Sequence, residues 1–287
     1  MDPTGIISVI LTFIGLIFAW FQIDHRFKRK KKLEKIPTDV LARVLKTKVL
    51  RIGWFDYPPF IEFNSDNSKK PKGLYPLILK KVSEKFNLKI EWTQINIGDC
   101  IGMIENDKVD IVISIFQTAK RAKKTDFTCF LHSITVGGVT KKSIKDVNSL
   151  TDLLNSNYKI VVSKGEIGHE LIDTLDIRNS RITIINTDNI SKILSFLRSG
   201  DAEIALLDSV SIKNYFTKTA DSYLKSLKQI FVNRPLEICH MGTMIPIGQK
   251  KLSDWIEGEF RIARNDKKIQ LVESEIIENY KELVSKF

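Results

Sequence analysis

Short runs of apolar or alternating residues recur along the chain and are separated by segments with helical spacing. Three such runs lie in the first half of the chain, at residues 48–54, 88–95 and 109–116. The third run is apolar enough to form a strand that is buried on both faces. Between the first two runs, residues 74–87 place their apolar side chains on one face of a helix and their lysines away from it. This order predicts a mostly parallel sheet that is covered by helices.

The same alternation of strand-like and helical segments occurs in the second half of the chain. Strand-like runs occupy residues 157–163, 181–186 and 202–208, again with helical segments between them. The two halves thus have a similar order of strands and helices, with a connector between them. This order predicts two α/β lobes. We assign the first lobe to residues 48–138 plus 241–287 and the second lobe to residues 144–232. Two segments that cross between the lobes would then form a hinge.

An apolar segment stands near the amino terminus. Residues 5–22 carry no charge and approach the lower limit of about 17 residues that a helix needs to span a bilayer. A cleaved signal peptide would begin with Lys or Arg, whereas Asp2 is the only charged side chain before this segment. A buried core helix is a poor alternative for a terminal segment that is apolar all round. We therefore predict a transmembrane helix over residues 5–22, followed by a basic juxtamembrane linker over residues 23–47.

The formal net charge of +11 is unevenly distributed. About half of the excess lies between Arg26 and Lys35, where Glu34 is the only acidic residue. No zinc-finger spacing, RNA-binding aromatic signature or basic helix with heptads accompanies this run, so we expect no nucleic-acid partner. Positive charge gathers on the cytoplasmic side of a membrane helix, and the basic run would also lie close to anionic lipid.

The three cysteines, Cys100, Cys129 and Cys239, are too few and too scattered for a disulfide framework. Cys129 precedes His132 by three positions and Cys239 is followed by His240, and zinc prefers such ligands. Adjacent ligands in the second pair are poorly spaced for chelation, however. Buried thiols and histidines that pack at the hinge are the simpler interpretation. We expect no metal and no cofactor.

Three segments carry a more specific signal. Residues 50–60 read LRIGWFDYPPF, residues 108–127 run from KVDIVIS to TDF, and residues 197–209 read LRSGDAEIALLDS. In this order and on the predicted elements, they resemble the family 3 solute-binding proteins, which capture amino acids and similar polar solutes for transporters. The resemblance covers about residues 48–285. It implies the type II periplasmic-binding fold, an α/β fold with two lobes and a two-segment hinge.

The resemblance also implies roles for individual residues. In the family, an arginine corresponding to Arg121 binds the carboxylate of the ligand, and an aspartate corresponding to Asp208 receives its ammonium group. This chemistry is sound, because a planar guanidinium matches a carboxylate bidentately. The other ligand-binding candidates are Ser114 and Thr118 on a loop, Tyr57 and Phe60 as an aromatic wall, and Glu166. The alternative is that neither residue has a binding role. In that case Arg121 is one more solvated base, and Asp208 only caps the next helix.

Glu166 departs from the family pattern. Many relatives have Gly-Thr-Thr at a helix start where this chain has Gly165, Glu166 and Ile167. Helix amino ends attract anions, whereas Glu166 would repel a ligand carboxylate there. Either Glu166 points away and caps its own helix, or the ligand is not an ordinary amino acid. An enzyme is the alternative, because some relatives of this fold resemble cyclohexadienyl dehydratases, and Glu166 near His169 would then act as the proton donor.

We therefore interpret the chain as a non-enzymatic, membrane-anchored protein that binds a small polar, amino-acid-like solute by hinge closure. It would act as a transport receptor or as a ligand sensor, so its expected partners are the solute, the membrane and a transporter or signalling protein. The family resemblance favours an extracytoplasmic domain. The basic run directly after the apolar segment favours the cytoplasmic side of a single-pass membrane protein, and this is our expectation.

Overall fold

The computed structural model describes residues 39–63, 70–145, 147–175, 177–187 and 189–286. The predicted transmembrane segment 5–22 and residues 23–38 of the predicted linker lie outside these ranges. None of the helices within the described ranges has the length and apolar character needed to cross a bilayer. Val40–Phe287 form one compact unit.

The first alternation of strands and helices forms as the sequence pattern predicts. Its elements are β1 (Val49–Trp54), α3 (Leu74–Phe86), β2 (Lys89–Gln94), η1 (Ile97–Asp99), α4 (Cys100–Glu105), β3 (Ile111–Phe116) and α5 (Ala119–Ala122). β1 pairs in parallel with β2 and β3, so that Ile52 lies opposite Trp92 on one side and Ile111 on the other. β3 is buried along its whole length, as expected of a strand covered on both faces.

The second alternation forms a similar group. Below, the first group means the elements from β1 to α5, and the second group means those from α6 to β8. Its elements are α6 (Leu150–Asn155), β5 (Ile160–Ser163), α7 (Ile167–Ile172), η2 (Asn179–Arg181), β6 (Ile182–Ile185), α8 (Ile190–Ser199), β7 (Ile204–Asp208), α9 (Ser209–Lys218), η3 (Ser222–Ser226) and β8 (Leu227–Ile230). β5 lies between β6 and β7 and is parallel to both. α8 is bounded by ordinary capping signals, since Asn189 accepts backbone N–H bonds at its start and Gly200 ends it with φ 87°.

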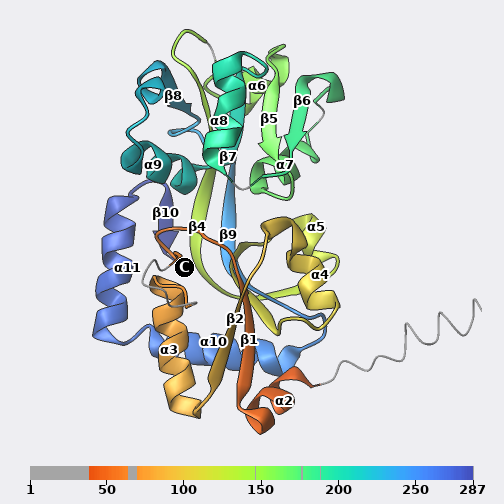
Figure 1. Ribbon diagram of the computed structural model, residues 1–287, viewed down its shortest axis with the longest axis vertical. Helices are drawn as coiled ribbons and strands as arrows, with labels where there is room; N and C mark the ends of the chain where they lie inside the picture. Colours follow the sequence, from red (N-terminus) through yellow and green to blue (C-terminus); the bar gives the residue numbers. More distant parts are fainter. Residues whose placement is uncertain (1–38, 64–69, 146, 176, 188, 287) are drawn as a thin grey trace, which may run out of the picture. The chain divides into compact units, whose positions relative to one another are not determined.

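Two long antiparallel strands connect the two groups. β4 (Asp126–Lys141) and β9 (Glu237–Ile245) pair from Asp126 opposite Ile245 to Val136 opposite Glu237. β9 also pairs with β3, and β4 also pairs with β7 and β8, so one sheet with the order β2-β1-β3-β9-β4-β7-β5-β6 runs through both groups (Figure 1). The sequence pattern predicts a connector after residue 138, between the two units, and glycines such as Gly137 and Gly138 are poor strand formers. Pairing with strands on both sides overrides that local preference.

The carboxyl-terminal segment packs on the first group. α10 (Lys250–Ala263) and α11 (Lys267–Asn279) both contact α3. The helical pattern of residues 273–287 predicts a last helix that continues to residue 287. Instead, a short strand β10 (Val284–Lys286) follows and pairs antiparallel with β4, with Val284 opposite Ile134. This strand covers an edge of β4 that would otherwise lack backbone partners.

Apolar side chains at the junction bring the two groups into contact. The second group has two cores of its own, one around Val161 and Leu197 and the other around Val162. By contrast, Ile167 of α7 and Val210 of α9 belong to the large core that also contains the side chains of α3 and β1. The amino-terminal parts of α7 and α9 therefore pack against the first group.

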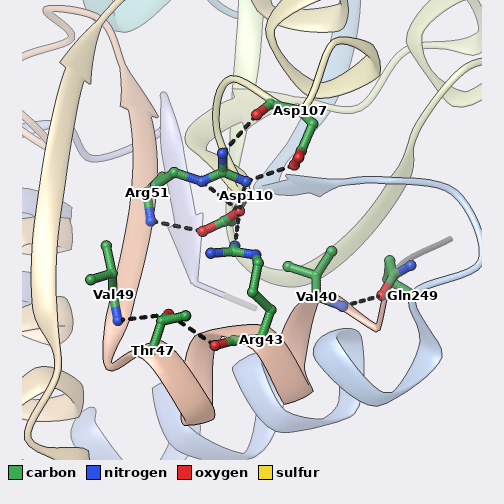
Figure 2. Close-up of polar contacts among 8 residues, drawn as sticks. All are labelled: Val40, Arg43, Thr47, Val49, Arg51, Asp107, Asp110 and Gln249. Atoms are coloured by element: carbon green, nitrogen blue, oxygen red, sulfur yellow. Dashed lines mark hydrogen bonds and ion pairs between the residues drawn. The ribbon is translucent and has the colours of Figure 1, made fainter.

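Residues 40–47, at the end of the predicted linker, form helix α2 (Val40–Thr47). The helix buries two valines, and its Arg43 bonds to the Asp110 carboxylate (Figure 2). Arg51 of β1 bonds to the same carboxylate through its guanidinium and, at 2.8 Å, through its backbone N–H. Asp110 thus joins α2 to β1, and this helix is part of the compact unit.

Candidate functional site

A cavity of about 280 Å³ lies where the carboxyl ends of strands from both groups meet. The first group contributes the loop after β1, Ile97, which follows β2, and Phe116, which is the last residue of β3. The second group contributes the end of β7 and parts of α8 and α9, as well as Glu166 at the start of α7. Open α/β sheets bind ligands outside the carboxyl ends of their strands, so this cavity is the candidate site.

Asp208 and Tyr57 meet at one wall of the cavity. Asp208 is 5% exposed, and its Oδ1 accepts a hydrogen bond from the Tyr57 hydroxyl at 2.8 Å. The same oxygen accepts the backbone N–H of Ser211 at 2.8 Å, so Asp208 also caps α9. Burial raises the pKa of Asp208, although the hydrogen bonds from Ser211 and Tyr57 act in the opposite direction. Burial and the nearby Asp208 charge also raise the pKa of Tyr57.

The predicted aromatic wall is formed in part by other residues. The Tyr57 ring stacks on Phe60 with a centroid distance of 5.6 Å, and it meets Phe116 edge-on at 5.9 Å. Tyr57, Phe116 and Phe55 line the cavity. Phe60 is fully buried and stands behind Tyr57, so it fixes the tyrosine ring from the protein interior.

Arg121 is 1% exposed, so its interpretation as a solvated base is wrong. Its Nη1 donates to the Phe116 carbonyl at 2.7 Å, and its Nη2 donates to the Gly165 carbonyl at 2.8 Å. Its Nε lies 3.3 Å from Oε1 of Glu170, a buried residue of α7. Arg121 therefore links the two groups, and it is not among the described residues that line the cavity. Its role as a carboxylate ligand stays a prediction.

Ser114 and Thr118 lie on the segment that leads to Arg121. The Thr118 hydroxyl accepts the backbone N–H of Arg121 at 3.2 Å and so caps α5. Ser114 is buried with φ 58°, and its hydroxyl donates to the Met241 sulfur at 3.3 Å. Neither side chain belongs to the described lining of the cavity. Both shape the backbone that positions Arg121.

Glu166 lines the cavity, and its side chain does not cap α7. The hypothesis that it turns away to cap its own helix is therefore wrong. His169, its proposed catalytic neighbour, accepts the Gly165 N–H at its Nδ1 at 3.1 Å. Nε2 of the same ring lies 3.7 Å from Asp173 Oδ1. His169 thus contacts groups of its own segment and is not part of the described cavity wall that contains Glu166.

The sequence analysis missed several polar residues of the cavity. Asn189 precedes α8, and Asn214, Tyr215 and Lys218 belong to α9. No local motif marks them. Their position was nevertheless accessible, because α8 and α9 follow the carboxyl ends of β6 and β7, where ligands of α/β sheets bind.

The two Cys-His pairs lie on the two long strands, Cys129 and His132 on β4 and Cys239 and His240 on β9. His132 Nε2 lies 3.1 Å from Glu273 Oε1, whereas His240 Nδ1 is 2.9 Å from the Ser133 hydroxyl. Burial raises the pKa of both Cys129 and Cys239 to about 12. Among the residues that the structure describes, no three His, Cys, Asp or Glu side chains are grouped as a metal would need.

The comparison with protein families agrees with the fold. Residues 50–278 match the family described as bacterial extracellular solute-binding proteins, family 3. The chain belongs to this family. The match runs from β1 into α11, which confirms the α/β two-lobed periplasmic-binding fold that the resemblance implies. It also confirms a solute-binding, non-enzymatic role.

Individual proteins are similar to this family 3 protein in sequence or in fold. It is 27% identical over 194 residues to a probable amino-acid ABC transporter-binding protein of Haemophilus influenzae, covering 65% of this chain and 70% of that protein. An ABC uptake transporter substrate-binding protein from Streptococcus pneumoniae, solved with bound histidine, has a TM-score of 0.69 at 18% identity over 86% of this chain and 99% of that chain. The solute receptor for L-cysteine of Neisseria gonorrhoeae has a TM-score of 0.65 at 19% identity, with 84% and 95% covered.

The localisation predicted from the sequence is wrong. A single-pass membrane protein with a cytoplasmic domain was expected, whereas the family to which this chain belongs is one of extracellular binding proteins. The Haemophilus relative is named a probable amino-acid ABC transporter-binding protein. Residues 5–22, on which the anchor prediction rests, are outside the described part of the chain.

Proposed function

We propose that this family 3 protein binds a small polar solute that carries an amino group and that its two lobes close on this solute. The hydrogen bond between Tyr57 and Asp208 carries the proposal, since it places a buried carboxylate and an aromatic ring from opposite groups at one cavity wall. A carboxylate pairs with an ammonium group, and an aromatic face attracts it. A solute that touches both lobes favours the closed state through its additional contacts.

The lobes that we propose are residues 48–138 plus 241–287 and residues 144–232, with β4 and β9 as the hinge. The separate cores of the second group support this division. We further propose that the solute is amino-acid-like and is passed to an ABC transporter. This proposal follows the named functions of the Haemophilus and Streptococcus relatives.

Within the site, we assign direct contact with the solute to Asp208, Tyr57 and Glu166. All three line the cavity, and they come from both groups. Phe60 supports the Tyr57 ring. The segment that contains Ser114, Thr118 and Arg121 holds the two groups together behind the cavity wall. The Arg121 guanidinium bonds to Glu170 of α7 and to the carbonyl of Gly165, which lies two residues before that helix.

Replacing Asp208 by asparagine is expected to weaken solute binding by at least about tenfold, or about 1.4 kcal/mol. Asparagine caps helices as well as aspartate does, so Asp208→Asn keeps α9 and removes only the charge. A thermal-shift panel of amino acids and alkylamines identifies the solute, because a ligand of the folded state raises the unfolding midpoint. Calorimetry then compares the two proteins. A panel in which no compound stabilises the protein, or an unchanged affinity in the variant, contradicts the proposal.

Replacing Gly165 by alanine is expected to weaken solute binding about tenfold, because it disfavours the closed state. A Cβ atom on Gly165 would lie 2.9 Å from the Gly98 Cα of the first group, and Gly165 has φ 81°. Gly200→Ala is the matched control, since Gly200 has φ 87° and its Cβ would meet nothing within 4 Å. Calorimetry with the solute from the panel measures both variants. Equal affinities would show that the close approach of the two glycines plays no part in binding.

A further inference from the structure

Two asparagine side chains line the cavity on the side of the second group. Asn189 stands directly before α8, and Asn214 belongs to α9, which contacts α8. In both residues a group of the protein already binds the amide oxygen. Asn189 Oδ1 accepts the backbone N–H groups of Ser191 at 2.9 Å and Lys192 at 3.4 Å, and Asn214 Oδ1 accepts the Tyr280 hydroxyl at 3.4 Å. These bonds leave the amide nitrogens for a solute.

The amide nitrogens are donors without a partner among the described residues. Each carries two N–H groups and cannot accept a hydrogen bond. Lys218 of α9 adds a further donor, and it is the one cationic side chain among the described residues that line the cavity. Its Nζ lies 4.0 Å from Glu62 Oε1, so this pairing is loose. Asn189, Asn214 and Lys218, which we call the donor wall, therefore offer N–H groups to an acceptor on the solute.

The first group contributes an acceptor to the same cavity. Asp56 lies in the loop after β1 and lines the cavity, and its Oδ1 accepts the backbone N–H of Phe63 at 2.7 Å. No described residue donates a hydrogen bond to its other carboxylate oxygen. Asp208 is the acceptor that the proposed function assigns to the ammonium group of the solute. The rest of the solute thus meets N–H donors of α8 and α9 and one carboxylate oxygen of the loop after β1.

A side-chain carboxamide suits both kinds of partner at once. Its carbonyl oxygen accepts from the donor wall, and its NH₂ group donates to Asp56. A side-chain carboxylate would also accept from the donor wall, but Asp56 would repel it. A side-chain ammonium would pair with Asp56, but it would leave both asparagine nitrogens without an acceptor. An apolar side chain would leave all of these polar groups without partners in the closed cavity, which is unfavourable.

We propose that the solute is an amino acid whose side chain ends in a carboxamide, and that Asn189 and Asn214 donate to its carbonyl oxygen. Its ammonium group pairs with Asp208 beside Tyr57. Its main-chain carboxylate is left to Arg121, as the family resemblance predicts. This inference rests on the proposed function, since it names the side chain of the solute that the cleft binds.

Calorimetry with matched amino acids tests the proposed side chain. L-glutamine and L-asparagine are each compared with their acid counterparts and with L-norleucine, whose side chain is apolar. We expect the tighter of the two carboxamides to bind at least about tenfold more tightly than its acid counterpart and than L-norleucine. Equal or tighter binding of the acid, of L-norleucine or of L-lysine overturns the inference, while the proposed function stands. If no amine or amino acid of the panel binds, the proposed function itself fails.

The variants Asn189→Asp and Asn214→Asp give a separate readout. Aspartate caps helices as well as asparagine does, and it keeps an oxygen for Tyr280, so only the donors are lost. We expect the affinity for the carboxamide amino acid relative to L-norleucine to fall about tenfold in each variant. Asn265→Asp is the control, because it makes the same change at an exposed residue outside the described cavity lining. The unfolding midpoint shows that each variant is folded. An unchanged ratio of affinities in either folded variant overturns the donor wall.

Discussion

Replacing Asp110 by asparagine is expected to lower the free energy of unfolding by about 3 kcal/mol. The Asp110 side chain has no solvent exposure, and its carboxylate accepts bonds from the guanidinium groups of Arg43 and Arg51 (Figure 2). Its Oδ2 also accepts the backbone N–H of Arg51 at 2.8 Å. Asparagine keeps one acceptor oxygen, but its amide nitrogen cannot accept the bonds made to the other oxygen. The two guanidinium groups also lose the buried negative charge that lies between them. Urea denaturation of the two proteins measures the difference.

Asp107 offers a control with the same chemical change. Asp107 bonds to the same Arg51 at 2.6 Å, but its side chain is 72% exposed. Exposed ion pairs contribute little, so Asp107→Asn is expected to cost less than about 1 kcal/mol. Asparagine also tolerates the positive φ of 54° at this position. If both variants lost the same stability, burial of the Asp110 carboxylate would not be the reason for its effect.

Replacing Glu273 by glutamine is expected to cost about 3 kcal/mol at neutral pH. Glu273 is 1% exposed, and its carboxylate meets Arg264 Nη2 at 2.6 Å, Lys286 Nζ at 2.8 Å and His132 Nε2 at 3.1 Å. These partners stand on β4, on β10 and just after α10, so one carboxylate holds the carboxyl-terminal segment to a hinge strand. Denaturation at neutral pH compares this variant with Glu275→Gln, which changes an exposed residue of the same helix.

The pH dependence of stability gives a second test of Glu273. Burial alone would raise its pKa, but the bonds from His132, Lys286 and Arg264 outweigh burial and lower the pKa from 4.5 to about 2. The folded state thus binds this proton less readily than the unfolded state. The contribution of Glu273 is present above about pH 4.5 and is lost as the pH falls towards about 2. The stability of Glu273→Gln should fall less over this range than that of the wild type, and parallel curves would contradict the assignment.

Most strands could be predicted from the sequence, because their signal is local. Alternating or continuous apolar residues mark β1, β3 and β7 within a few positions of their observed ends. The same local pattern placed Asp208 at the end of a strand, where it caps the next helix and faces the cavity. Tyr57 follows β1 in a loop that its prolines already indicate.

Strands β4 and β10 could not be predicted in the same way. β4 contains Gly137 and Gly138 and an irregular register between Thr128 and His132, so no simple alternation runs through it. β10 has only three residues and would be called helix from its neighbours. Both strands form because segments that are distant in the sequence supply their backbone hydrogen bonds. A local pattern of residues does not identify these partners.

The sequence by itself determined the two α/β units, their order and the position of Tyr57 and Asp208 beside a shared cleft. Only the tertiary structure decided that Arg121 pairs with Glu170 across the junction and that Glu166 faces the cavity. The partner of a charged side chain depends on which groups lie within a few ångströms of it after folding. Arg121 and Glu170 are far apart in the sequence, and nothing in the residues between them marks the ion pair that the fold creates.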